Sequence, residues 1–369
     1  MGAQHLYVHL PFCSSRCGYC DFVTVVGRRT EHGSYVDALL RELDLRAALL
    51  DTPLETVYLG GGTPTFTDAP ELERLLDALP DAAEVTVEAN PETVTADLAA
   101  LLARAGVDRV SLGAQTFAPR LLAVLDRVAQ PDDVRRALYH LRDAGIDNIS
   151  LDLIYGVPGQ EPADLERDLA EALALEPEHI SAYELEAKPG TRFTHAHGAE
   201  LERQAESMET YFERVVETLT AAGFRWYETA NFCRSPAQSG GRDLRARHNL
   251  GYWLGHDYLG LGVGAVSTIE NRRWRNAPSL ARYLAALEQG VIPPHETESL
   301  PAAVRDTERL MLGLRLDEPL PLSGLEDTLD PVQLERLEGL GLVVHEAGML
   351  RLTPRGRFLG GGVTARLLA

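Results

Sequence analysis

The chain has 369 residues, of which 45% are apolar, 24% charged and 7% aromatic, which is typical of globular proteins and excludes collagen-like, coiled-coil and disordered chains. Thirty-five Lys and Arg against 55 Asp and Glu give a net charge of −20, so we expect neither nucleic-acid binding nor stable membrane insertion. No apolar run approaches the roughly 18 residues of a membrane span, and the start of the chain lacks a signal-peptide pattern, so a cytoplasmic location is expected.

Short apolar runs alternate with amphipathic segments from the start of the chain to about residue 230, as in successive βα units. The predicted strands are His5–His9, Thr56–Leu59, Val85–Glu88, Arg109–Leu112, Ile149–Ile154 and Ile180–Leu185. The predicted helices are Ser34–Leu50, Pro70–Leu79, Thr95–Ala105, Pro131–Ala144 and Glu161–Leu175. Gly106 and Gly145 follow two of these helices, where a left-handed C-cap is favoured. Six parallel strands with right-handed crossovers predict an α/β fold, an incomplete (βα)6 barrel similar to a TIM barrel, over residues 1–232.

The pattern changes beyond residue 230. Ser235–Gly241 indicates a flexible connector, so residues 233–300 are expected to form a linker region, followed by a smaller α+β module over 301–369. In this module a helix through Leu310 and Leu314 and a helix near Leu334–Leu340 precede a hairpin of residues 342–344 and 349–352, an order that resembles a winged helix. The segment 325–340 is acidic, which disfavours DNA binding.

Three of the four cysteines, Cys13, Cys17 and Cys20, form a C-x3-C-x2-C run directly after the first strand. Three thiolates can hold three irons of a 4Fe-4S cluster and leave the fourth iron open. The amino and carboxylate groups of S-adenosylmethionine suit an open iron, and an electron from the cluster would then cleave its sulfonium bond. The alternatives are a zinc site completed by Cys233 or His9, and structural thiols that bind nothing.

Polar residues and glycines follow the next strands. Gly60-Gly61-Gly62-Thr63-Pro64 comes after the second strand, where glycine lets a ligand approach the backbone. Glu88 ends the third strand, Gln115 follows the fourth, and Asp152 lies on the fifth among apolar residues, where a carboxylate needs a polar partner. The carboxyl ends of barrel strands form the rim that carries functional sites, so we predict one ligand pocket there.

The cysteine motif resembles that of the radical S-adenosylmethionine (SAM) proteins. The runs Tyr7–Cys13 (YVHLPFC) and Cys20–Phe22 (CDF) are more narrowly similar to the oxygen-independent coproporphyrinogen III oxidase group, and the resemblance covers nearly the whole chain. It implies a 4Fe-4S cluster held by the three clustered cysteines. It also implies S-adenosylmethionine contacts from Tyr7, Gly61, Gly62, Thr63, Glu88, Gln115, Arg127 and Asp152.

One departure bears on the reaction. The oxidases carry a further cysteine two positions after the third, and Phe22 stands there in this chain. A second S-adenosylmethionine site and a porphyrinogen pocket are also not evident in the sequence. Decarboxylation is therefore disfavoured, and whether the chain is an enzyme stays open.

The run His248-Asn249-Leu250-Gly251-Tyr252-Trp253 resembles the HNxxYW motif of the HemW-type haem chaperones. The resemblance implies haem binding by His248, Asn249, Tyr252 and Trp253. A neutral imidazole is a good axial ligand for haem iron, and the two aromatic rings supply flat apolar area.

Alternatives remain for this segment. Asn249 and Trp253 could pack a domain interface while His248 only forms hydrogen bonds. His256 is the rival iron ligand if His248 points inward, and Arg245 and Arg247 are either partners of the haem propionates or surface charge.

The sequence thus predicts a haem chaperone that carries a 4Fe-4S cluster, S-adenosylmethionine and haem, and that delivers haem to apo-haemoproteins such as respiratory enzymes. The alternatives are an oxygen-independent coproporphyrinogen III oxidase and a radical SAM enzyme acting on another tetrapyrrole. Because an incomplete barrel leaves a sheet edge exposed, a homodimer is a further expectation.

Overall fold

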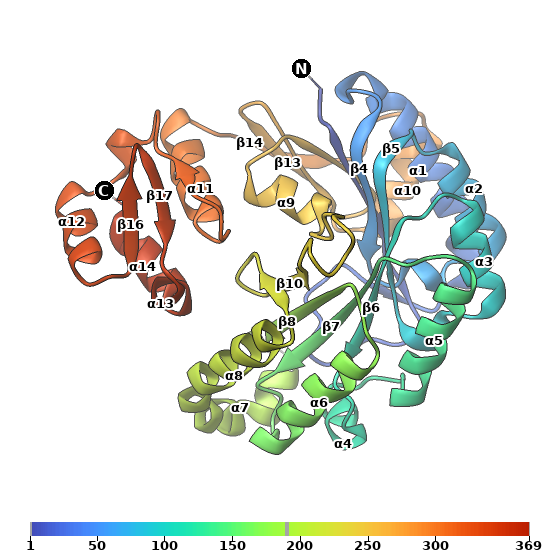
Figure 1. Cartoon of the computed structure of the whole chain (residues 1–369). Helices are drawn as coiled ribbons and strands as arrows, with labels where there is room; N and C mark the ends of the chain where they lie inside the picture. The colour runs from blue at the N-terminus through green and yellow to red at the C-terminus, as the bar shows by residue number, and fades with distance from the viewer. Residues whose placement is uncertain (1, 189–191, 369) are drawn as a thin grey trace.

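A curved 12-stranded sheet with helices on its outer side dominates the computed structural model, which describes residues 2–188 and 192–368 (Figure 1). Its centre consists of six neighbouring parallel strands: β1 (His5–Leu10), β4 (Leu54–Gly61), β5 (Ala82–Ala89), β6 (Arg109–Gln115), β7 (Ile149–Tyr155) and β8 (His179–Glu184). These are the six strands expected from the sequence, and the α/β fold with an incomplete barrel is confirmed.

The outer helices also follow the prediction. They are α1 (His32–Arg46), α2 (Ala69–Ala78), α3 (Ala96–Arg104), α5 (Pro131–Asp143) and α6 (Pro162–Ala174). Thr95 begins α3 as its N-cap, since its hydroxyl accepts a hydrogen bond from the backbone N–H of Leu98. Gly106 and Gly145 have φ angles of +76° and +93°, the left-handed conformation predicted after α3 and α5.

The sheet extends beyond these six strands on both sides. Next to β1 lie β11 (Tyr258–Leu261), which is parallel to it, and then β12 (Val266–Ile269), β13 (Arg272–Asn276) and β14 (His295–Ser299), which are antiparallel. Next to β8 lie β10 (Asn231–Arg234) and β9 (Phe224–Trp226). The expected linker over 233–300 therefore contains strands that continue the barrel sheet. They are only four or five residues long, too short for a clear alternation of apolar and polar residues.

One helix lies on the inner side of the sheet. Helix α9 (Arg247–Trp253) carries the HNLGYW run and packs against β4 on the concave side (Figure 1). Gly251 makes this approach feasible, because a Cβ at this position would lie 2.7 Å from Nε2 of His5 on β1. Leu6 and Val8 of β1 point outward into the core, so His5 and Tyr7 point toward the barrel interior.

The chain after residue 300 forms a separate small unit (Figure 1). It contains α11 (Ala302–Gly313), β15 (Leu320–Pro321), α12 (Pro331–Gly339), β16 (Val343–Glu346), β17 (Met349–Leu352), α13 (Pro354–Phe358) and α14 (Gly360–Leu367). The predicted order of two helices and a hairpin is present, and the unit has its own leucine-rich core. The guanidinium of Arg225 on β9 donates two hydrogen bonds of 2.8 Å to Asp317, which ties this unit to the barrel.

The remaining elements are short or lie at the periphery: β2 (Phe12–Cys13), β3 (Val25–Val26), α4 (Pro119–Val124), α7 (Arg192–Gln204), α8 (Met208–Ala221), α10 (Leu280–Glu288) and the 3-10 turns Arg29–Glu31, Ala47–Leu49, Pro64–Phe66, Pro91–Thr93, Ala205–Ser207 and Glu326–Thr328. Among the described residues, no helix combines the length and apolar character needed to cross a bilayer.

Candidate functional site

The three clustered cysteines lie on the loop that leaves β1. Cys13 ends the short strand β2, and Cys17 and Cys20 follow in the segment that leads to β3. The hydroxyl of Thr63, in the glycine-rich turn, donates to Sγ of Cys13 at 3.5 Å, so the loop and the turn are in contact. Burial raises the pKa of the Cys13 thiol, and the nearby thiols of Cys20 and Cys17 raise it further. The three sulfur atoms therefore share one region at the carboxyl rim of the barrel.

The glycine-rich turn needs its glycines. Gly61 has a φ angle of +109°, and a Cβ there would lie 2.4 Å from the ring of His9. A Cβ on Gly62 would lie 2.6 Å from the backbone of Pro11. The backbone N–H of Gly61 donates to Glu88 at 3.1 Å. The turn therefore packs closely against the loop after β1 and the end of β5.

Two half-buried carboxylates, Glu88 and Asp152, face the barrel interior. Glu88 accepts a hydrogen bond of 2.7 Å from the hydroxyl of Tyr58, and burial raises its pKa to about 6. Asp152 accepts hydrogen bonds from the hydroxyls of Ser111 and Ser150, and burial raises its pKa as well. The polar partner that Asp152 was expected to need is thus supplied by serines on its own strand and the neighbouring one.

Arg127 is half-buried and joins several parts of the rim. Its Nη2 donates to Oδ1 of Asn90 at 2.9 Å and to the carbonyl of Gly113 at 2.8 Å, and its Nη1 lies 3.7 Å from Sγ of Cys17. Its Nε is buried and has no hydrogen-bond partner among the described residues. A buried guanidinium N–H without a partner suits an anionic ligand group.

Gln115 ends β6 in the left-handed conformation, with a φ angle of 64°. A Cβ on Gly113 would lie 2.7 Å from Nε2 of Gln115, so the absence of a side chain at Gly113 makes room for the Gln115 amide. The side chain is thereby held at the rim, near Arg127. The predicted S-adenosylmethionine residues on β4, β5 and β6 are brought together as expected.

These residues fit a 4Fe-4S cluster with a bound sulfonium nucleotide. Three thiols supply the donors for three irons, and the unpaired Nε of Arg127 suits a carboxylate beside Cys17. The absence of side chains at Gly61 and Gly62 lets the glycine-rich turn lie directly against His9 and Pro11, beside the cysteine loop.

The zinc alternative does not fit. His9 has both ring nitrogens occupied, with Nδ1 3.0 Å from the hydroxyl of Tyr7 and Nε2 2.8 Å from the carbonyl of Val23. Cys233 is buried on β10 in a cluster with Tyr227 and Leu244. Within the part of the chain that the structure describes, no three His, Cys, Asp or Glu side chains converge on a single metal ion.

A cavity of about 210 Å³ lies between the cysteine loop and α9. Tyr7 and His9 line it from β1, Asp21–Val23 from the segment after Cys20, and Tyr252 from α9. The remaining lining residues are Tyr258, Gly264, Ala265, Val266 and Arg275. Of the residues predicted to contact S-adenosylmethionine, Tyr7 lines this cavity, and Tyr252 of the HNLGYW helix lines it as well.

His248 points inward. Its Nδ1 lies 2.7 Å from the hydroxyl of Thr56, its Nε2 lies 2.9 Å from the hydroxyl of Tyr252, and its ring stacks on Tyr58 at 5.0 Å between centroids. Burial lowers its pKa to about 3. Because both nitrogens are occupied and the side chain is 2% exposed, this arrangement does not offer His248 to haem iron.

Trp253, the last residue of the HNLGYW run, faces the small C-terminal unit. Trp253 packs with the cluster that contains Leu250 and Leu316, and the guanidinium of Arg315 lies 4.4 Å from its ring centroid. Asn249 is half-buried on the same helix. Trp253 is therefore part of an interface between the barrel and the C-terminal unit, which was one of the alternatives.

The two arginines upstream of the run differ. Arg245 donates to Glu318 at 2.8 Å and to Asp243 at 2.7 Å, so it forms ion pairs at the interface between the barrel and the C-terminal unit. Arg247 is exposed, and its backbone N–H donates to Glu84.

Sequence reasoning missed the surroundings of His256. This side chain is exposed just after α9, its Nδ1 lies 3.0 Å from Nε2 of His5, and the two rings stack at 5.3 Å. His5 in turn lies 2.8 Å from the hydroxyl of Thr56. The alternation of His5, Tyr7 and His9 on β1 was the available signal that these side chains share one face.

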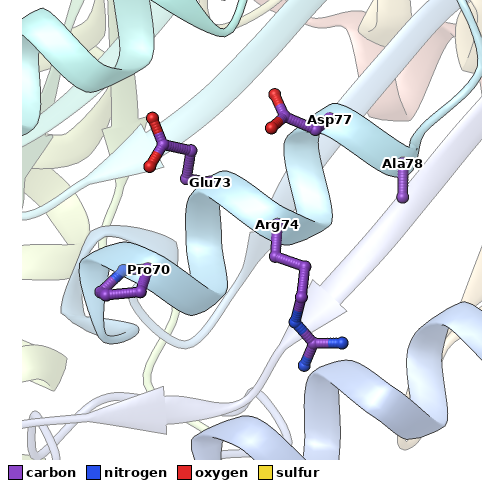
Figure 2. Close-up of a pocket in the computed structure, with 5 residues that line it drawn as sticks. All are labelled: Pro70, Glu73, Arg74, Asp77 and Ala78. Carbon is purple, nitrogen blue, oxygen red and sulfur yellow. The ribbon is translucent and has the colours of Figure 1, made fainter.

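A second depression, of about 370 Å³, lies on the outer side of α2 (Figure 2). Two of its charged groups are paired locally, since Arg74 pairs with Asp37 and Glu71, and Glu73 pairs with Arg104. It lies away from the strand ends and is no candidate for the functional site.

Comparisons with known proteins agree with this geometry. Residues 7–172 match the family model of the radical SAM superfamily, and residues 300–359 match the HemN C-terminal domain. A protein of Mycobacterium tuberculosis named Heme chaperone HemW is 39% identical over 98% of this chain and 94% of its own length. The proteins of that name from Bacillus subtilis and Escherichia coli are 32% and 33% identical, over 98% and 95% of this chain and 98% and 94% of their own lengths.

The solved structure of coproporphyrinogen III oxidase (HemN) from Escherichia coli, described as a radical SAM enzyme, has the same fold. It superposes with a TM-score of 0.81 over 99% of this chain and 90% of that one, at 24% identity. The full-length match to the HemW proteins, together with the cysteine loop, the glycine turn and the HNLGYW helix, shows that the chain belongs to the HemW family of the radical SAM superfamily.

Proposed function

We propose that this protein is a haem chaperone, which binds haem and passes it to apo-haemoproteins. The observation that carries the proposal is the position of α9. The helix with the HNLGYW run lies inside the barrel and reaches the cavity beside the cysteine loop through Tyr252. The relatives that match over nearly the full chain are named haem chaperones, which supports the same conclusion.

The rim residues have a separate task in this proposal. Cys13, Cys17 and Cys20 hold the 4Fe-4S cluster, which supplies an electron that can cleave the sulfonium bond of S-adenosylmethionine. Gly61 and Gly62 hold the glycine-rich turn against the loop after β1, Arg127 neutralises the carboxylate of the nucleotide, and Glu88, Gln115 and Asp152 orient its polar groups from the strand ends. Tyr7 is held in place by its hydrogen bond to His9.

Phe22 separates this proposal from an oxygen-independent coproporphyrinogen III oxidase. The residue is 64% exposed and lines the cavity at the position where the oxidase group has a further cysteine. A phenylalanine side chain cannot ligate a metal or transfer a hydrogen atom as a thiol does.

The test is anaerobic reconstitution of the cluster, followed by two assays on the same preparation. A haem titration followed by transfer to an apo-cytochrome is expected to show stoichiometric binding and delivery. A parallel incubation with coproporphyrinogen III, S-adenosylmethionine and reductant is expected to yield no protoporphyrinogen. Product formation in the second assay, or no haem binding in the first, would overturn the proposal.

The finer parts of the proposal concern partners and location. Respiratory haemoproteins in the cytoplasmic compartment or facing it are the proposed acceptors. A homodimer is also proposed, because β14 and β9 leave an unpaired edge at each end of the sheet. Light scattering of the reconstituted protein measures its mass, and the mass of a monomer at all concentrations would contradict the proposed homodimer.

A further inference from the structure

The two histidines of the α9 region differ in what they offer to a ligand. His248 is buried with both nitrogens occupied, whereas His256 is exposed and, among the described residues, only its Nδ1 has a hydrogen-bond partner, Nε2 of His5 at 3.0 Å. A histidine that binds a metal through one ring nitrogen usually has the other held by a hydrogen bond, which fixes the ring and raises its basicity. His256 has this arrangement.

We infer that His256, and not His248, supplies the axial nitrogen to haem iron, with His5 as its positioning residue. The inference rests on the proposed haem-chaperone function and names the ligand within it. His256 is exposed at the turn after α9, two residues from Leu254, which is 48% exposed and offers apolar contact to a macrocycle. Arg305 on α11 lies 4.0 Å from Asp257 and is a cation within reach of the same turn for a propionate.

His256 is also the end of a hydrogen-bonded chain that crosses the barrel. The chain runs from His256 to His5 at 3.0 Å, to Thr56 at 2.8 Å, to His248 at 2.7 Å and to Tyr252 at 2.9 Å. Each neutral imidazole in it donates through one nitrogen and accepts through the other. The direction of all four bonds is therefore set together.

Iron at Nε2 of His256 selects one of the two directions. Nδ1 then carries the proton and donates to His5, which donates to Thr56, whose hydroxyl donates to His248, which donates to the oxygen of Tyr252. The Tyr252 proton is left to point into the cavity shared with Tyr7. In the opposite direction Tyr252 donates to His248, and Nε2 of His256 carries a proton and cannot bind iron. Haem binding at the surface thereby sets the orientation of a hydroxyl beside the cysteine loop.

The first experiment compares His256→Gly, His248→Gln and, as a matched exposed histidine on the C-terminal unit, His345→Ala in the full-length reconstituted protein. Ferric haem titrations are followed by the Soret band, with and without added imidazole. We expect His256→Gly to weaken binding by about 10-fold or more and to recover the wild-type spectrum with imidazole, and the other two variants to keep the wild-type spectrum.

The outcomes separate the inference from the proposed function. If wild-type protein binds no haem, the proposed function fails. If wild-type protein binds haem and His256→Gly binds it equally well with an unchanged spectrum, or if only His248→Gln loses the spectrum, the function stands and the ligand assignment is wrong.

A second experiment tests the positioning role of His5. His5→Leu removes the partner of His256, so the ligand becomes less basic, and the haem midpoint potential is expected to rise while affinity falls about 10-fold. His5→Gln keeps a polar partner and is expected to restore part of both. A potential that is identical in wild-type and His5→Leu protein would rule out the hydrogen bond as a determinant of the ligand.

Discussion

Arg127 at the carboxyl rim of the barrel and His248 on α9 both carry buried hydrogen-bonding atoms, but these atoms are satisfied to different degrees. At the rim, Arg127 keeps a buried Nε without a partner and the cysteine thiols lie next to one another. Around α9, each ring nitrogen of His248 has a partner within 3 Å. Unsatisfied groups indicate where a ligand binds, and satisfied groups indicate a framework that holds other residues in place.

The largest expected effect tests the rim. Cys20→Ser removes one of three thiol ligands and is expected to abolish the broad visible absorbance and the bound iron after anaerobic reconstitution. Cys233→Ser is the matched control, because Cys233 packs in an apolar cluster and is expected to leave the cluster absorbance unchanged. Full iron content in Cys20→Ser would show that the cysteine loop does not hold the cluster.

Arg127→Gln tests whether the unpaired Nε marks the carboxylate site. The variant removes a charged donor, so S-adenosylmethionine binding is expected to weaken about 10- to 100-fold, while iron content stays at the wild-type level. Equilibrium dialysis of the nucleotide and iron analysis measure the two properties on one preparation. Arg135→Gln is a suitable control, since Arg135 forms exposed pairs with Asp132 and Glu171 on the outside of the barrel.

The framework side of the comparison predicts a stability effect. His248→Ala leaves the buried hydroxyl of Thr56 with one partner fewer and opens a cavity against Tyr58, so the free energy of unfolding is expected to fall by about 3 kcal/mol. His256→Ala removes an exposed ring and is expected to change it by less than about 0.5 kcal/mol. Chemical denaturation of both variants without ligands checks the difference, and equal losses would mean that the two histidines do not differ in this way.

The rim was largely predictable from the sequence because its signals are local. Cys13, Cys17 and Cys20 lie within eight positions of the sequence, and the glycines at the end of β4 follow one another directly, so each motif is visible in a short stretch of chain. The alternation of strands and helices in the sequence predicts parallel strands, and parallel strands place Glu88 and Asp152 on the same side of the barrel.

The α9 region was not predictable in the same way. His5 meets His256 across 251 positions, and Thr56 meets His248 across 192, so no local pattern records either contact. The short strands β11 to β14, which bring the two ends of these contacts together, carry too few residues for a periodic signal. The HNLGYW motif identified the helix, but only the contacts across the fold show that His248 is buried with both nitrogens paired and that His256 is exposed.

The smallest expected effect concerns Glu88, which has hydrogen-bond partners like a framework residue and lies at the rim like a ligand-binding residue. Glu88 is satisfied by Tyr58 and Gly61, yet burial raises its pKa to about 6 from an ordinary value of 4.5. The folded state therefore binds the proton more tightly than the unfolded state, so the stability contributed by protonation is present below about pH 4.5 and is lost as the pH rises to about 6. Glu88→Gln, which stays neutral, is expected to be more stable than wild-type protein at pH 7.5 by about 1 to 2 kcal/mol, and to lose the dependence of stability on pH between these two values.

The same variant is expected to bind S-adenosylmethionine more weakly, because a carboxylate kept ionised at a cost to stability is retained for a ligand. Denaturation at several pH values measures the first effect and dialysis the second, and a variant less stable than wild type at pH 7.5 would place Glu88 with the framework.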